Sequence, residues 1–231
     1  MMRPLFVKHC VLCGAVAEKH FCLACRESLP YLPSLHCVIC ALPLPQSGVC
    51  GACLVDPPAF DQIVAAANYA FPVDALIHSL KYQANLTLAP VLGDLLTARL
   101  DLADPLKRPD FIVPMPLHPR RLRERGFNQA LEISRRVSKT SGIPTLPAVC
   151  RRIEDTSSQT GLPWKEREKN IRNAFVCERD LAGKHVAILD DVMTTGATLN
   201  ELAKVLRKCG AACVSGWVVA RTLSSDHTKI I

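Results

Sequence analysis

The 231-residue chain lacks both common glycine-rich nucleotide-binding motifs, GxxxxGK[ST] and GxGxxG. Their absence argues against a P-loop NTPase and against a dinucleotide-binding domain. No apolar run approaches the roughly 18 residues that cross a bilayer. The opening MMRPLFVKHC has no signal-peptide core before the first cysteine pair. We therefore expect a cytoplasmic protein without membrane insertion.

The overall composition is that of a globular protein, but charge is distributed unevenly along the chain. Hydrophobic residues make up 49% and charged residues 21%, which is typical of a folded chain. Residues 107–172 carry 15 Lys and Arg against 7 Asp and Glu, whereas the whole chain has a net charge of +7. This basic stretch favours a polyanionic ligand, either phosphates or nucleic acid. A solvated basic surface would give the same pattern.

Cysteine is abundant, with twelve residues, and eight of them form four CxxC pairs near the start of the chain. A CxxC turn brings two thiolates to one metal, and two such turns complete a tetrahedral site. Zinc is the metal expected in a cytosolic chain, and its role is structural because four thiolates leave no position open for water. We predict about two zinc ions, with sequential and cross-brace pairing both open. The predicted ligands are Cys10, Cys13, Cys22, Cys25, Cys37, Cys40, Cys50 and Cys53.

The most informative stretch for chemistry is 184–199, KHVAILDDVMTTGATL. Its apolar run 186–189 predicts a buried parallel strand, which ends at Asp190 and Asp191. A Thr/Gly turn then opens a predicted helix, whose first backbone N–H groups form a natural phosphate site. Acids for sugar hydroxyls beside a cradle for phosphate predict a phosphorylated sugar as ligand. The residues of the turn are Thr194, Thr195, Gly196, Ala197 and Thr198.

The sequence Asp56-Pro57-Pro58 is a stiff break and predicts a boundary between a small module, 1–57, and a larger domain, 58–231. Strands and helices alternate after residue 106, which predicts a parallel sheet with helices on both faces. The remaining predicted elements are strands at 61–70, 110–113, 146–153 and 214–220, helices at 73–80, 86–100 and from about 129 to 140, and a frayed tail at 221–231.

The stretch LDDVMTTGAT closely resembles the phosphoribosyl diphosphate (PRPP) loop of type I phosphoribosyltransferases. The resemblance implies that Asp190 and Asp191 contact the ribose hydroxyls and that residues 194–198 hold the 5-phosphate. In such an enzyme the same acids would stabilise the reacting ribosyl centre, so they are the candidate catalytic residues. PRPP carries several negative charges, so Mg²⁺ is expected with it.

A second segment, VPMPLHPRRLRERGFNQA, resembles the signature of the ComF family of bacterial competence proteins. With the CxxC head and the PRPP-like loop it gives the family's three parts in order. The resemblance implies an α/β fold: a parallel-sheet type I phosphoribosyltransferase-like domain, preceded by a small Cys-rich zinc-ribbon module. Residues 58–106 would then be a hood-like part and 107–231 the core.

The resemblance also implies two further groups of site residues. The loop after the first core strand would contact pyrophosphate, with arginines nearby that bind phosphate through two N–H groups. The polar stretch 155–169 would be the mobile catalytic loop, although an exposed loop would read the same way. The implied pyrophosphate-side residues are Met115, Pro116, Leu117, Arg120 and Arg121. The implied mobile-loop positions are Gln159, Thr160, Arg167 and Asn170.

Two functions follow from the resemblance. The first is a PRPP-binding factor in natural transformation that handles single-stranded DNA, with a competence helicase or another competence protein as a partner. The second is a metabolic phosphoribosyltransferase with an unidentified base or other acceptor. Aromatic residues are only 5% of the chain, so stacking partners for nucleic-acid bases are few. No aromatic pair after the PRPP-like loop points to a purine or pyrimidine pocket.

Overall fold

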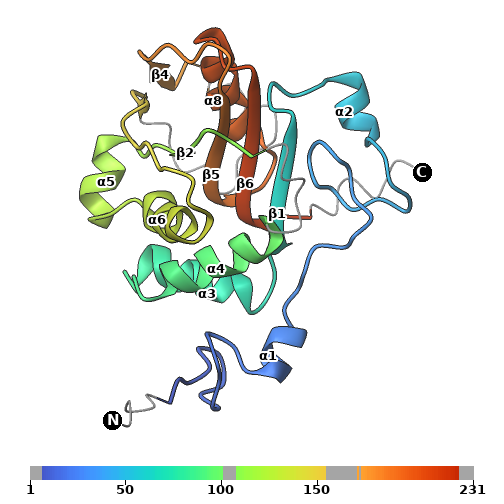
Figure 1. Cartoon of the computed structure of the whole chain (residues 1–231), viewed down its shortest axis with the longest axis vertical. Helices are drawn as coiled ribbons and strands as arrows, with labels where there is room; N and C mark the ends of the chain where they lie inside the picture. The colour runs from blue at the N-terminus through green and yellow to red at the C-terminus, as the bar shows by residue number, and fades with distance from the viewer. Residues whose placement is uncertain (1–6, 101–107, 155–170, 172, 224–231) are drawn as a thin grey trace.

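The computed structural model describes residues 7–100, 108–154, 171 and 173–223 of the chain. Its centre is a parallel four-stranded sheet in the order β1-β6-β5-β2 (Figure 1). The strands are short apolar runs that are buried over most of their length, as expected when both faces of a parallel sheet are covered. They are β1 (Gln62–Asn68), β2 (Phe111–Pro114), β5 (His185–Met193) and β6 (Cys213–Arg221).

β5 differs from the predicted strand at its carboxyl end, since it does not stop at the two acids. Asp190 pairs with Val218 and Val192 with Ala220, so the ladder to β6 runs on to Met193. The strand therefore continues two residues past the predicted end at Asp190 and Asp191, because hydrogen bonding to the long neighbouring strand β6 continues after the apolar run stops. Asp190 and Asp191 therefore stand inside the last half of a strand, where neighbouring strands restrict their movement.

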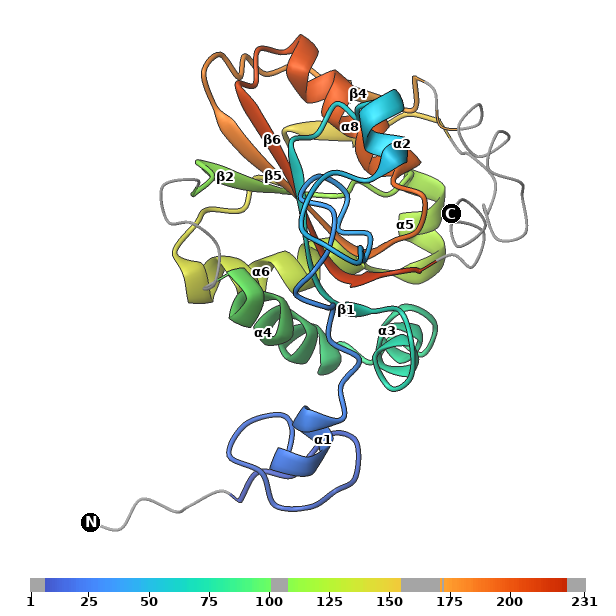
Figure 2. The same ribbon diagram turned by 90° about the vertical axis from the view of Figure 1, so that its right-hand side faces the viewer.

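Helices cover both faces of the sheet, as predicted. α4 (Leu88–Leu100) and α6 (Gln129–Ser141) pack on one face, and α8 (Ala197–Lys208) packs on the other (Figure 2). α3 (Val73–Tyr82) lies against α4. α4 and α6 approach closely at Gly93, where a Cβ atom would lie 2.7 Å from the Cβ of Arg136.

The basic segment after β2 forms a short helix of its own, α5 (Pro119–Arg125). Pro119 opens it at a position that needs no N–H donor, and Gly126 ends it in the left-handed conformation, with φ of 80°. The predicted strand at 146–153 is shorter than expected. Only β3 (Cys150–Arg152) is a strand, and it pairs antiparallel with β4 (Phe175–Cys177).

The two cysteine modules differ in how they join the domain. The first, which includes α1 (Leu23–Glu27), stands apart below the helices and contacts α4 through a 2.9 Å bond between His20 Nε2 and Asp94 Oδ2 (Figure 1). The second, which ends in α2 (Gly51–Val55), packs beside β1 and α8, and its cysteines belong to the same buried core as the sheet (Figure 2). The boundary after residue 57 stays a prediction.

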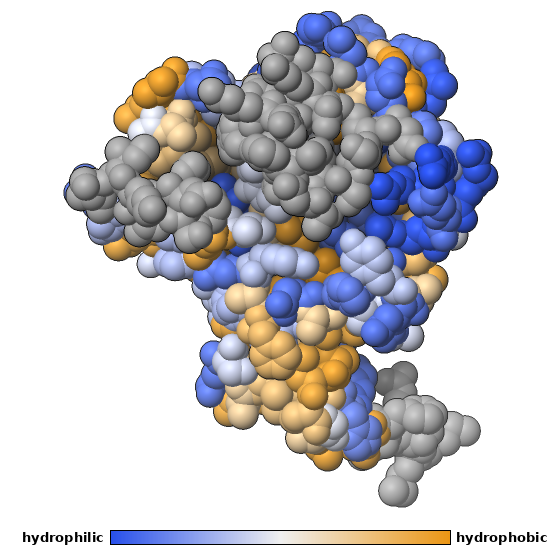
Figure 3. Space-filling model, turned by 180° about the vertical axis from the view of Figure 1, so that it is seen from behind, coloured by the Kyte–Doolittle hydropathy of each residue, from blue (hydrophilic) through white to orange (hydrophobic). Residues whose placement is uncertain are grey.

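The first module also exposes apolar side chains, among them Val11, Val16 and Leu23. Seen from behind, an apolar surface covers much of it (Figure 3). Within the described part of the chain, no helix is both long and apolar enough to cross a membrane.

Candidate functional site

Residues from two helices, α3 and α6, contact the acid pair on β5. Asp191 is only 2% exposed, and its Oδ2 atom forms an ion pair with the Nζ atom of Lys81, in the last turn of α3. Gln129, at the start of α6, brings its Nε2 atom to 3.5 Å from Asp191 Oδ1. Arg125 Nη1 in turn donates to Gln129 Oε1 at 2.5 Å. The basic helix α5 is thus connected to the acids through Gln129.

The pKa values of the two acids are shifted in opposite directions. Burial and the charge of Asp191 raise the pKa of Asp190 well above its ordinary value. Burial would also raise the pKa of Asp191, but the Lys81 ammonium and hydrogen bonds lower it below its ordinary value. For Lys81 itself, burial works to lower the pKa, and the Asp191 carboxylate more than reverses this, so the pKa is raised. Asp191 is therefore held as a carboxylate, ready to accept hydrogen bonds.

The turn after β5 has the geometry of an anion cradle. Gly196 takes φ of 85°, a left-handed conformation that costs glycine little, and α8 begins directly after it. Thr195 Oγ1 accepts from Ala197 N at 3.2 Å, which fixes the turn. The first N–H groups of a twelve-residue helix have no partners within the helix, so they are available to bind an anion at this end of α8. The structure thus brings Thr194, Thr195, Gly196, Ala197 and Thr198 together at the end of the strand that carries the acids.

The predicted pyrophosphate-side loop lies beside the same strand. Met115 N donates to Leu189 O at 2.8 Å, and Met115 O accepts from Asn128 Nδ2 at 3.0 Å. Asn128 also caps α6, since its Oδ1 atom accepts from Ala130 N at 2.9 Å. Pro116 and Leu117 continue this loop toward α5, which carries Arg120 and Arg121. Arg120 is largely exposed and forms a 3.0 Å ion pair with Glu124.

The predicted mobile-loop residues Gln159, Thr160, Arg167 and Asn170 lie outside the described residues.

Sequence reasoning missed three residues of the site and gave too little weight to a fourth. Gln129 and Asn128 sit at the start of α6, and an Asn before an apolar-periodic run was a readable capping signal. Lys81 is the residue given too little weight, since in the sequence it is an ordinary lysine after an apolar helix, but in the structure it pairs with Asp191. The prediction that Arg221 begins a frayed tail was wrong. Arg221 is a buried residue of β6, because β6 continues to this position, where it pairs with Met193 of β5.

A cavity of about 200 Å³ opens beside the turn. One side of it is formed by the turn and the first half of α8, including Gly196, Asn200 and Lys204. The other side is formed by the second cysteine module and by Phe60.

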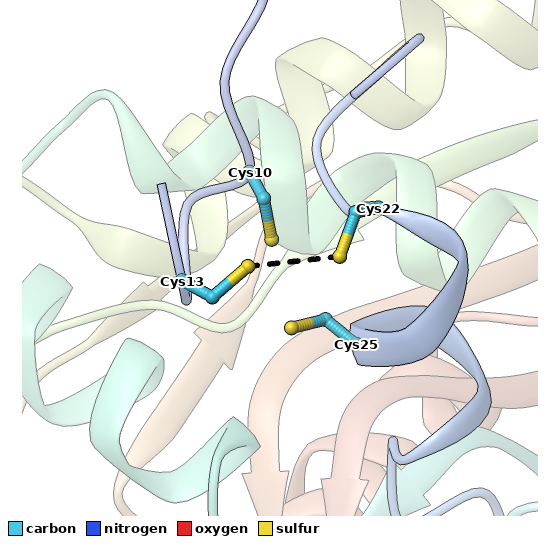
Figure 4. A group of neighbouring side chains, drawn as sticks. All are labelled: Cys10, Cys13, Cys22 and Cys25. Atoms are coloured by element: carbon cyan, nitrogen blue, oxygen red, sulfur yellow. Dashed lines mark hydrogen bonds between the residues drawn. The ribbon is translucent and has the colours of Figure 1, made fainter. Parts of the chain in front are cut away.

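The eight head cysteines form two separate groups of four, and in each the sulfur atoms lie within 4.8 Å of one another. In the first group the four side chains point toward a common centre, with Cys13 and Cys22 sulfurs 3.6 Å apart (Figure 4). Pairing is sequential: the first two CxxC turns share one site and the last two share the other. The first site joins Cys10, Cys13, Cys22 and Cys25, and the second joins Cys37, Cys40, Cys50 and Cys53.

The chemistry of both groups fits structural zinc. Four sulfur donors around one point match the tetrahedral preference of Zn²⁺ and leave no open position. Burial acts to raise the pKa of Cys10, but backbone N–H groups outweigh it and lower that pKa to about 6. Backbone N–H groups likewise lower the pKa of Cys37, against burial, to about 7. Each site therefore has a thiolate near neutral pH, the form that binds metal.

Two family models match separate parts of the chain. A model of the double zinc ribbon domain matches residues 1–54, and a model of the phosphoribosyl transferase domain matches residues 130–229. Competence protein F of Haemophilus influenzae is 34% identical over 230 residues, which cover 95% of this chain and 100% of that protein. The chain belongs to the ComF family.

Other ComF relatives span nearly the same length. DNA utilization protein YhgH of Escherichia coli K12 is 36% identical, over 93% of this chain and 97% of that protein. Competence protein ComFC of Bacillus subtilis is 24% identical, over 89% and 85%. Among solved structures, a purine phosphoribosyltransferase from Pyrococcus horikoshii is 21% identical and has a TM-score of 0.37. That match covers 58% of this chain and 73% of that protein.

Proposed function

We propose that this ComF chain binds PRPP together with Mg²⁺ at the end of β5 and acts in the handling of single-stranded DNA during natural transformation. The observation that carries the first half is the position of Asp191. It is a buried carboxylate kept ionised by Lys81, at the strand end that leads into the Gly196 turn. A carboxylate beside a cradle of backbone N–H groups matches the two ends of a ribose 5-phosphate.

Each part of PRPP has a counterpart in the site. Asp190 and Asp191 would accept hydrogen bonds from the ribose hydroxyls, and the turn at 194–198 would hold the 5-phosphate. The loop at Met115, which Asn128 fixes from α6, would meet the diphosphate. Bound Mg²⁺ would supply positive charge that offsets the diphosphate, and oxygen atoms of Asp190 suit such a hard cation.

The role in DNA handling rests on the relatives and on charge. Two of the relatives are named competence proteins, and another is named a DNA utilization protein. The exposed arginines of α5 would contact the phosphates of a single strand. The apolar surface of the first ribbon (Figure 3) would serve a protein partner such as a competence helicase. These steps take place in the cytoplasm in this proposal.

A second candidate function is transfer of ribose 5-phosphate from PRPP to an acceptor. The cavity beside the turn favours it, because it offers enclosed space next to the proposed 5-phosphate cradle. In this reaction the bond from the anomeric carbon to the diphosphate breaks and a bond to the acceptor forms. Asp190 or Asp191 would stabilise positive charge at the ribosyl centre, and the arginines of α5 would stabilise the leaving diphosphate.

Two measurements separate these functions. Pyrophosphate release from PRPP, with and without candidate bases, reports transfer, and its absence alongside tight binding favours the non-catalytic role. Single-stranded DNA affinity should fall steeply with salt, because phosphate neutralisation releases counterions. Binding that does not change with salt, or no binding at low salt, contradicts the DNA role.

A further inference from the structure

One buried side chain connects the second zinc site to the phosphate turn. Arg221, the last residue of β6, is 5% exposed. Its Nε atom donates to the carbonyl oxygen of Cys40 at 3.2 Å. Its Nη1 atom donates to the carbonyl oxygens of Met193, at 3.4 Å, and of Thr194. A single guanidinium therefore bonds a zinc-ligand residue and the first residue of the turn.

The electrostatics of this arrangement depend on both partners. A buried guanidinium is costly unless its charge and its N–H groups are matched. Zinc held by four thiolates leaves the second site with net negative charge, since the thiolates contribute more charge than the ion. A cation beside Cys40 offsets that charge and satisfies its own N–H groups on the turn.

A shared cavity and a hydrogen bond also connect the second ribbon with the region of the turn. The second ribbon and the turn form opposite sides of the cavity described above, which includes Cys40, Cys53 and Gly196 in its lining. Ala59, in the linker after the ribbon, donates from its backbone N to Asn200 Oδ1 on α8 at 2.6 Å. Among the described residues, the first ribbon makes no such approach, since it lies near α4, away from the turn (Figure 2).

We propose that the second zinc ribbon stabilises the conformation of the phosphate turn. Arg221 is a positioning residue that transmits the rigidity of the metal site to residues 194–198. The first zinc site has no such role. The inference deepens the proposed function, because it assumes that the turn receives the 5-phosphate of PRPP, but the coupling itself can be tested without that ligand.

The first test is hydrogen exchange of the turn amides in the zinc-loaded full-length chain. In Arg221→Met, the two amides that donate hydrogen bonds within the turn, Ala197 N to Thr195 Oγ1 and Asn200 N to Gly196 O, should exchange about tenfold faster, the effect of removing one partner from a buried, hydrogen-bonded charge. Arg221→Lys keeps the charge but not the forked set of N–H donors, so its exchange rate should lie between those of the parent and Arg221→Met. Cys25→Ser, which removes a ligand of the first site only, should leave turn exchange unchanged.

The second test adds a probe of the metal. Cobalt replaces zinc, and chelator titration followed by absorbance resolves the two sites. Arg221→Met should weaken cobalt binding at the second site about tenfold, because it removes a group that bonds a ligand residue, and should leave the first site unchanged. If Arg221→Met does not fold, the parent chain is used. Turn exchange should then rise as the second site is emptied, and not as the first is emptied.

Two results would overturn the proposal. One is turn exchange that stays unchanged in Arg221→Met or, if that variant does not fold, in the parent emptied of its second metal. The other is an equal change in turn exchange when either zinc site is emptied. PRPP titration separates this from the proposed function. If the parent binds no PRPP but turn exchange responds to Arg221, the coupling stands and the ligand is wrong. If PRPP binds and Arg221→Met weakens it about tenfold, the expected result for a loosened cradle, both stand.

Discussion

Lys81, in the last turn of α3, places its ammonium against the buried carboxylate of Asp191 on β5. α3 therefore completes the acid site on β5. This pair fixes the ionisation of Asp191 before any ligand arrives, and the same lysine lies beside the anionic ligand that we propose.

Lys81→Met should destabilise the protein by about 3 kcal/mol at neutral pH, because it leaves a buried carboxylate without its partner. The lowered pKa of Asp191 gives stability above its ordinary value of 3.8, which is lost as pH falls through the folded value. The raised pKa of Lys81 gives stability below 10.5, which is lost as pH rises through its folded value. Denaturant unfolding across pH should thus show the largest deficit between these limits. A deficit that does not shrink as the pH falls below 3.8 would contradict the pair.

Asp190→Asn should raise stability at neutral pH while weakening PRPP and Mg²⁺ binding. The pKa of Asp190 is raised by burial and by Asp191, so its ionised form destabilises the folded state above the ordinary value of 3.8. The amide removes that repulsion, and the melting temperature should rise by a few degrees at pH 7. The gain should vanish as the pH falls below 3.8, because Asp190 is then neutral in both the folded and the unfolded state. Lower stability at pH 7 would show that Asp190 is stabilised in a way this account misses.

Asn128→Ala should cost about 1–2 kcal/mol, the usual effect of losing a helix N-cap. It should also weaken PRPP binding, because Asn128 Nδ2 holds the carbonyl oxygen of Met115 at 3.0 Å. Asn128→Asp separates these effects, since it keeps the cap acceptor but loses the Nδ2 donor. Calorimetry should find near-normal stability with weak binding in the Asp variant. Normal binding in both variants would remove the Met115 loop from the site.

The two zinc sites should differ in their effect on stability. Metal analysis should give about two zinc ions per chain. Cys53→Ser should lower the melting temperature of the whole domain, because the cysteines of the second site are at most 9% exposed and lie in the common core. Cys25→Ser should remove one zinc and leave the main transition nearly unchanged, since the first ribbon stands apart. Equal losses from the two variants would contradict this division.

Local patterns in the sequence predicted much of the site. The CxxC spacing gave the zinc ligands, and the string from Asp190 to Thr198 gave a strand, a turn and a helix in their observed order. These predictions succeed because the chemistry depends on neighbours along the chain. Sequential zinc pairing was left open, since one spacing serves both arrangements, and only the separate positions of the two ribbons decide it.

The parts that could not be predicted depend on contacts between distant segments. Lys81 reaches Asp191 because α3 packs on α4 and ends near the edge of the sheet, a result of tertiary packing rather than of its own sequence. Arg221 seemed to begin a tail because hydrophobicity ends at Ala220, yet pairing with Met193 buries it. Hydropathy records burial of apolar side chains and gives no signal for a buried, hydrogen-bonded charge.

The central claim is that the end of β5 binds PRPP, and calorimetric titration of PRPP with Mg²⁺ tests it most directly. The parent chain should bind with one site per chain, and Asp190→Ala/Asp191→Ala should abolish the signal. Glu178→Gln changes an exposed acid that directly follows β4; it is the control and should bind like the parent. Adding single-stranded DNA to the same titration reports any coupling. A folded, zinc-loaded parent that gives no PRPP signal, or a double variant that binds as well as the parent, would contradict the account.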